Sequence, residues 1–137
     1  VVRNPWSRTF SAYRAFLRNP KRRAKLGLPD NVSFDEFCEK CLPGTDLTRS
    51  QTFWLLGANG KLGVDRAVRF HHLQEEMDQI SEEYGLPLKN LPNLLNHKPA
   101  DYREVYTDRT RNIVASVYAE EIALFDFHFN DEAEARK

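Results

Sequence analysis

The sequence has few glycines and cysteines and no long apolar run, so it lacks the features that identify several classes of protein directly. Its 137 residues include only six glycines and two cysteines, Cys38 and Cys41. This single C-x-x-C lacks the second ligand pair of a zinc site, so no metal is predicted, and two core residues on one helical face are expected instead. No apolar run approaches the ~20 residues of a membrane-spanning helix, so membrane association is not visible in this sequence.

Acidic residues are missing from the first 29 positions, which hold eight Lys or Arg. The net charge is still zero, because residues 30–137 carry all 20 acids and 12 of the 20 basic residues. Such an imbalance on a neutral chain indicates a local anion site, and nucleic acid is not the expected partner. Two alternatives remain open: a solvated basic face over Lys21 to Lys25, or a polyanion- or nucleic-acid-binding module that also uses Arg14 and Arg18.

Hydrophobic periodicity and turn residues predict both helices and strands. Trp6, Phe10, Tyr13 and Leu17 recur at helical spacing, and the order of capping and breaking residues places further helices downstream. The expected helices cover residues 6–17, 34–42, 73–84 and 107–125. The expected strand segments are 1–2, 51–56, 62–64, 67–70 and 127–129, with a hairpin turn at Asn59-Gly60 and a surface loop over 20–31.

The junction between the first strand segment and the first helix carries the clearest chemistry. A strand would deliver Arg3 to its carboxyl end, Asn4-Pro5 would break it, and a helix would open directly afterwards. Arg3 offers a planar guanidinium, the helix N-terminus is expected to offer unpaired N–H groups, and Ser11 offers a hydroxyl one turn further on. Together these groups suit a bound phosphate. The alternative for Arg3 is an ion pair at a strand end.

The same stretch resembles a motif of the sulfotransferases. In that family, R-N-P-x-x-x-x-x-S binds the 3′-phosphate of 3′-phosphoadenosine-5′-phosphosulfate (PAPS), and Arg3-Asn4-Pro5 and Ser11 match it. The longer pattern V-R-N-P-x-x-R-x-x-S-A-Y is most similar to the carbohydrate sulfotransferase branch. Later landmarks of that branch have counterparts here in the same order: F-D-E-F at 34–37, R-S-Q-T at 49–52, V-R-F at 68–70, Y-R-E-V-Y-T at 102–107, and Y-A-E-E-I within 114–129.

The resemblance implies an α/β fold, a P-loop-NTPase-like parallel sheet flanked by helices. Residues 1–137 would form the C-terminal portion of a single sulfotransferase domain, with 130–137 a frayed tail. The N-terminal strand and the phosphosulfate loop would be absent, because no G-x-x-x-x-G-K occurs and Gly57 to Lys61 has the wrong spacing. On this reading the fragment alone is expected to be inactive. The compartment would be the cytoplasm for a bacterial protein and the Golgi lumen for a eukaryotic one.

The resemblance also implies the site and its ligands. The expected enzyme moves a sulfuryl group from PAPS to an acceptor hydroxyl on a carbohydrate. Arg3 and Ser11 are carried over as ligands of the donor's 3′-phosphate, and Lys98 as a further phosphate contact. No catalytic residue is assigned, and Arg8 matches a family position without an assigned role. Relatives often carry His and Pro where this chain has Leu47 and Ser50, which weakens an acceptor-side role for that segment. A nucleotide kinase fragment is a third hypothesis.

Overall fold

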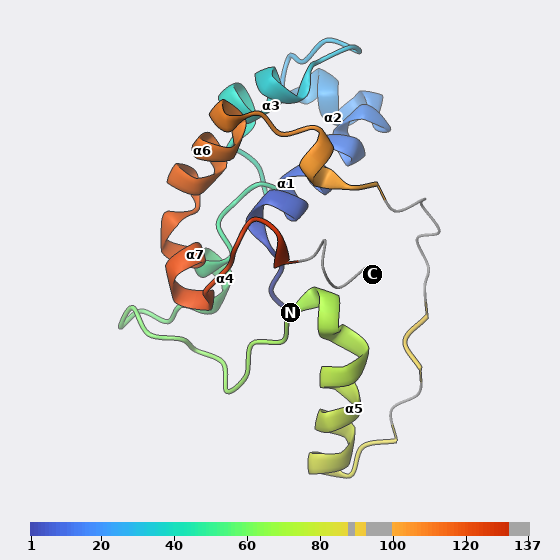
Figure 1. Cartoon of the computed structure of the whole chain (residues 1–137), viewed down its shortest axis with the longest axis vertical. Coiled ribbons are helices and arrows are strands. Elements are labelled where there is room, and N and C mark those ends of the chain that lie inside the picture. The colour runs from blue at the N-terminus through green and yellow to red at the C-terminus, as the bar shows by residue number, and fades with distance from the viewer. Residues whose placement is uncertain (88–89, 93–99, 132–137) are drawn as a thin grey trace.

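The protein is mainly helical (Figure 1). The structure is a computed structural model that describes residues 1–87, 90–92 and 100–131. The α-helices are α1 (Pro5–Leu17), α2 (Pro20–Lys25), α3 (Phe34–Cys41), α4 (Thr52–Leu55), α5 (Leu73–Tyr84), α6 (Asp108–Val117) and α7 (Ala119–Phe125). Two 3₁₀ turns join them, η1 (Phe70–His72) and η2 (Tyr102–Glu104). No helix in the described ranges has the length and apolar character needed to cross a bilayer.

The predicted α/β fold, with its P-loop-like parallel sheet, is wrong. The described residues contain no β-strand, and their β pairing is limited to two isolated bridges, parallel between Val2 and Arg69 and antiparallel between Leu56 and Leu62. The first bridge joins two segments that were expected to be strands. It goes no further because α1 begins at Pro5 on one side and η1 at Phe70 on the other.

Other predicted strands are replaced by helix or by side-chain packing. Residues 51–56 were expected to be extended, but most of them form the single turn of α4. Phe127 and Phe129 follow Asp126, which ends α7 in the left-handed conformation with φ 52°, and both rings pack into the core instead of joining a sheet. The chain does turn back at Asn59-Gly60, but the predicted two-residue hairpin turn is a longer connection, because the Leu56–Leu62 bridge encloses residues 57–61.

The helices α1, α3 and α5 lie where periodicity and caps predicted them. The single helix predicted over 107–125 is instead two helices, α6 and α7, because Tyr118 between them leaves the helical conformation with φ −110° and ψ 26°. The Asn4 side chain caps α1, and the Ser33 hydroxyl accepts a hydrogen bond from the Glu36 N–H at 3.1 Å at the start of α3. Gly85 ends α5 with φ 63°, a conformation that favours glycine. The predicted loop over 20–31 is wrong in its first half, because Pro20 opens α2 under an Asn19 cap.

The core is built around α1, which packs against α3 and α6 (Figure 1). One buried cluster contains Val2, Trp6, Phe34, Cys38, Tyr102, Val114, Tyr118 and Phe127, and a second contains Ala12, Phe16, Val32, Phe37 and Cys41. Both cysteines are free and buried, which confirms their prediction as core residues. Several aromatic pairs in the first cluster meet edge to face, for example Phe34 and Tyr106 at 4.8 Å between centroids.

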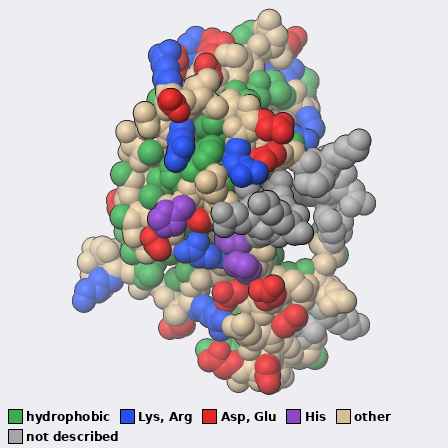
Figure 2. Space-filling view, in the orientation of Figure 1, with side chains coloured by type: hydrophobic (Ala, Val, Ile, Leu, Met, Phe, Trp, Pro, Cys, Tyr) green, Lys and Arg blue, Asp and Glu red, His purple; other side chains and the backbone are tan. Residues whose placement is uncertain are grey.

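One helix stands apart from this core. In Figure 1, α5 extends away from the other helices, and Figure 2 shows acidic side chains gathered on that part of the molecule. The α5 segment contains five Asp or Glu and no Lys or Arg. Arg66 pairs with two of these acids, Glu76 at 2.8 Å and Glu83 at 3.4 Å. The acidic part of the chain is thus separated from the basic helices α1 and α2.

Candidate functional site

The candidate phosphate site begins where the chain enters α1. The Val2 N–H donates to the Val68 carbonyl at 2.7 Å, and the Phe70 N–H donates to the Val2 carbonyl at 2.8 Å. These two bonds hold residue 2 extended beside 68–70 and bring Arg3 to the start of the helix. The local geometry expected at this junction is therefore present, although it is a single bridge and not the edge of a sheet.

The Arg3 guanidinium turns along the side of α1. Its Nη2 donates to the Ser7 hydroxyl at 2.9 Å, and its Cζ lies 4.6 Å from the centroid of the Phe70 ring. Ser7 and Ser11 are four residues apart in one helix, so their side chains lie on the same face. Arg3 is thereby directed to the helix face that carries Ser11. Their role as 3′-phosphate ligands stays a prediction, and Lys98 lies outside the described residues.

The N-terminal N–H groups of α1 are already used, which corrects the expectation that they would meet a ligand. Pro5 has no N–H, and the Asn4 side-chain oxygen accepts from Trp6 at 3.0 Å and Ser7 at 3.3 Å. The Arg8 N–H donates to the Asn4 carbonyl at 2.9 Å. Asn4 is itself fully buried. An anion at this end of the helix would therefore be bound by side chains.

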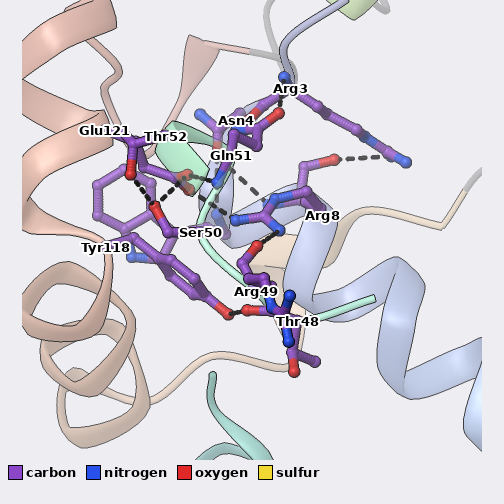
Figure 3. A network of polar contacts seen from close by, with 12 residues as sticks. Arg3, Asn4, Arg8, Thr48, Arg49, Ser50, Gln51, Thr52, Tyr118 and Glu121 are labelled. Atoms are coloured by element: carbon purple, nitrogen blue, oxygen red, sulfur yellow. Dashed lines mark hydrogen bonds and ion pairs between the residues drawn. The ribbon is translucent and has the colours of Figure 1, made fainter. Parts of the chain in front are cut away.

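A side-chain amide holds the main chain of Arg3 from the other side (Figure 3). The Gln51 Oε1 accepts from the Arg3 N–H, and the Gln51 Nε2 donates to the Arg3 carbonyl, both at 2.8 Å. This pair of bonds is the one that a neighbouring strand would make. Gln51, from the residues just before α4, thus takes the place of a strand beside Arg3.

The same region is fixed by the carboxylate of Glu121 on α7 (Figure 3). Glu121 has no exposed surface and accepts from the Gln51 N–H at 2.6 Å, the Ser50 hydroxyl at 3.1 Å and the Arg8 Nη2 at 2.6 Å. Arg8 also donates to the Arg49 carbonyl at 2.9 Å. These bonds join α1, α7 and the segment before α4, so the unassigned Arg8 acts as a structural ion-pair partner.

Tyr106 and Tyr118, two tyrosines next to this network, are poor candidates for a general base. Tyr106 donates to the Trp6 carbonyl at 2.8 Å, and Tyr118 donates to the Thr48 carbonyl. Burial raises the pKa of Tyr106 far above its usual 10.0. Burial also raises the pKa of Tyr118 to about 12, with the nearby Arg8 guanidinium acting in the opposite direction. Both phenols therefore remain protonated near neutral pH and serve as donors.

Reasoning from the sequence missed the network around Glu121, although part of it had a sequence signal. Glu121 follows Tyr118 by three residues and Val114 by seven, so it lies in the apolar stripe of the last helical region. An acid inside such a stripe indicates a buried cationic partner. Nothing in the sequence indicates which cation it is, and nothing indicates that Gln51 pairs with Arg3.

No family model, curated protein or solved structure matches this chain. The likeness to sulfotransferases therefore depends on the motif residues themselves. Within 1–87, 90–92 and 100–131, no group of three or more His, Cys, Asp or Glu is arranged to hold a metal ion.

Proposed function

We propose that this chain belongs to a sulfotransferase that moves a sulfuryl group from PAPS to an acceptor hydroxyl on a carbohydrate. In this proposal Arg3 and Ser11 bind the 3′-phosphate of the donor. The observation that carries it is the bond from the Arg3 guanidinium to Ser7, which directs the cation along the helix face on which Ser11 lies. The R-N-P-x-x-x-x-x-S match supplies the pairing of Arg3 with Ser11.

Chemical complementarity supports a phosphate as the ligand. A guanidinium presents a fork of N–H donors that matches two phosphate oxygens, and a serine hydroxyl adds a third donor. Ser7, Ser11, Arg14 and Arg18 fall within a sector of about 60° around α1 at 3.6 residues per turn. No acid lies in the first turn of this helix. The face is therefore polar and cationic, as a bisphosphate nucleotide requires.

The role of these residues in the reaction would be donor affinity. Sulfuryl transfer, like phosphoryl transfer, depends on positioning and on positive groups that stabilise the leaving oxygens. Arg3 and Ser11 would hold the distal phosphate of the nucleotide and so fix the orientation of the sulfate at its other end. The proposal also includes Lys98 as a further phosphate contact, and only the sequence resemblance supports this residue.

Calorimetric titration of the chain with 3′,5′-adenosine bisphosphate tests the proposal. Loss of a charge-assisted bond costs ~1.5–3 kcal/mol, so Arg3→Ala should weaken binding about tenfold to hundredfold, and Ser11→Ala should weaken it less. Lys61→Ala is the control, because it removes an exposed cation that lies outside α1 and α2. Adenosine 5′-monophosphate, which lacks the 3′-phosphate, should bind wild type and Arg3→Ala alike. Unchanged bisphosphate affinity in Arg3→Ala would remove Arg3 from the site.

A second candidate is a polyanion-binding module, and the exposed cations of α1 and α2 favour it. None of the ion pairs formed within the described ranges involves the side chains of Arg14, Arg18, Lys21, Arg22 or Lys25. Arg23 differs, because it is buried and pairs with Asp30 at 3.0 Å. This candidate predicts tight binding of a single-stranded oligonucleotide, with an affinity that falls steeply with salt and upon Arg14→Ala or Arg18→Ala. The bisphosphate should then compete no better than ATP.

A further inference from the structure

The main chain of Arg3 is held by a side chain rather than by a strand. A backbone partner would bond to Arg3 whatever its sequence, but here both bonds come from the carboxamide of Gln51. The Arg3 N–H needs an acceptor and the Arg3 carbonyl needs a donor. The Gln51 amide supplies both from one planar group, whereas an ionised glutamate would supply only the acceptor.

Gln51 is in turn held by a buried charge. Its N–H donates to the Glu121 carboxylate at 2.6 Å, and that carboxylate also accepts from the Ser50 hydroxyl and from the Arg8 guanidinium. Because Glu121 is fully buried, these bonds are shielded from water and gain strength from the low dielectric. The main chain of Gln51 is therefore held by contacts that are separate from the bonds between its side chain and Arg3.

From these contacts we infer that Gln51 is a positioning residue for Arg3. Its amide fixes the Arg3 backbone (Figure 3). With the backbone held, the guanidinium donates to Ser7, one turn before Ser11 on α1. The inference rests on the proposed function for its effect on ligand binding. Its geometric content, an Arg3 side chain ordered by Gln51, does not depend on which anion binds.

Titration of the full chain with 3′,5′-adenosine bisphosphate tests the binding effect. Gln51→Ala should weaken binding on the order of tenfold, the equivalent of one to two lost hydrogen bonds. Gln51→Glu keeps the acceptor, removes the donor and should also weaken binding. Gln74→Ala is the matched control, because Gln74 likewise accepts a main-chain N–H, that of Leu91 at 2.8 Å, but lies on α5.

A double-mutant cycle separates positioning from a general structural role. If Gln51 acts through Arg3, then Gln51→Ala should cause no further loss of affinity in an Arg3→Ala background. A loss of the same size in both backgrounds, or unchanged affinity of Gln51→Ala in the wild-type background, would overturn the inference.

Nuclear magnetic resonance gives a readout that needs no ligand. The Arg3 Nε–H should give a high heteronuclear NOE in wild type and in Gln74→Ala, and a clearly lower one in Gln51→Ala and Gln51→Glu. An Arg3 side chain that stays equally ordered in the Gln51 variants would refute the positioning role. If the wild-type chain does not bind the bisphosphate, the proposed function fails, and this measurement still decides the role of Gln51.

Discussion

The guanidinium of Arg8 donates to the carboxylate of Glu121 across 2.6 Å, although the two residues are 113 positions apart in the chain. Glu121 is fully buried, and the Arg8 side chain is 15% exposed. Arg8 also lies over the Tyr118 ring, with 4.7 Å from its Cζ to the centroid. This ion pair links α1 to α7. The same carboxylate accepts from the Gln51 N–H and so holds the segment whose side chain bonds to Arg3.

Removing one partner of this pair should destabilise the protein strongly. Glu121→Ala would leave Arg8 uncompensated and take an acceptor from Ser50 and Gln51, so the free energy of unfolding should fall by ~3–5 kcal/mol. Glu120→Ala is the control, because Glu120 is exposed on the same helix. Urea denaturation followed by circular dichroism measures both variants. Equal stabilities of the two variants would contradict a structural role for Glu121.

The cap of α1 should matter more than the cap of α2. Asn4 is buried, caps two N–H groups and donates from its Nδ2 to the His128 carbonyl at 2.6 Å. Asn4→Ala should therefore cost ~1 kcal/mol for the cap plus ~0.5–1.5 kcal/mol for the lost hydrogen bond to the His128 carbonyl.

Asn19→Ala is the matched comparison for that cap. Asn19 is half-buried, and its side chain accepts one N–H, that of Arg22 at 3.1 Å, in an exposed hydrogen bond, so its loss should cost ~1 kcal/mol or less. Thermal and urea unfolding of both variants would measure the difference. A cost for Asn4→Ala no larger than that for Asn19→Ala would show that the bond to His128 contributes nothing.

Stability should fall in alkaline solution because two buried phenols resist ionisation. The pKa of Tyr118 is raised by burial to about 12 and that of Tyr106 is raised further, whereas the ordinary value is 10.0. Above pH 10 the unfolded chain releases these protons and the folded chain retains them. The stabilisation is complete below pH 10 and declines as pH rises toward 12, by ~1.4 kcal/mol per pH unit for each group.

The Tyr118→Phe variant isolates one of these groups. It should show a shallower loss of stability between pH 10 and 12 than wild type, by the contribution of one proton. Unfolding monitored by circular dichroism, with phenolate absorbance recorded in parallel, would measure this slope. An identical slope in the variant would mean that Tyr118 ionises equally in the folded and unfolded chains.

The sequence by itself determined where α1, α3 and α5 begin and end, since those boundaries depend on neighbours in the chain, but it did not predict the break at Tyr118 between α6 and α7. Asn4 and Ser33 bond to N–H groups within three residues, and Gly85 takes a left-handed conformation that few other residues adopt. Hydrophobic spacing predicted the buried face of α3 in the same local way, but the stripe predicted on α5 contains no buried residue. The sequence also brought Arg3 and Ser11 into one short segment.

Only the tertiary structure decided whether extended segments would pair and which polar groups would meet. The strand prediction failed because β-structure needs distant partners, and the Val2–Arg69 bridge stops where helical turns begin on both sides. Gln51 pairs with Arg3 across 48 positions, and Glu121 reaches Arg8 across 113. No local pattern encodes such contacts, because they arise when helices pack and buried polar groups must find partners far along the chain.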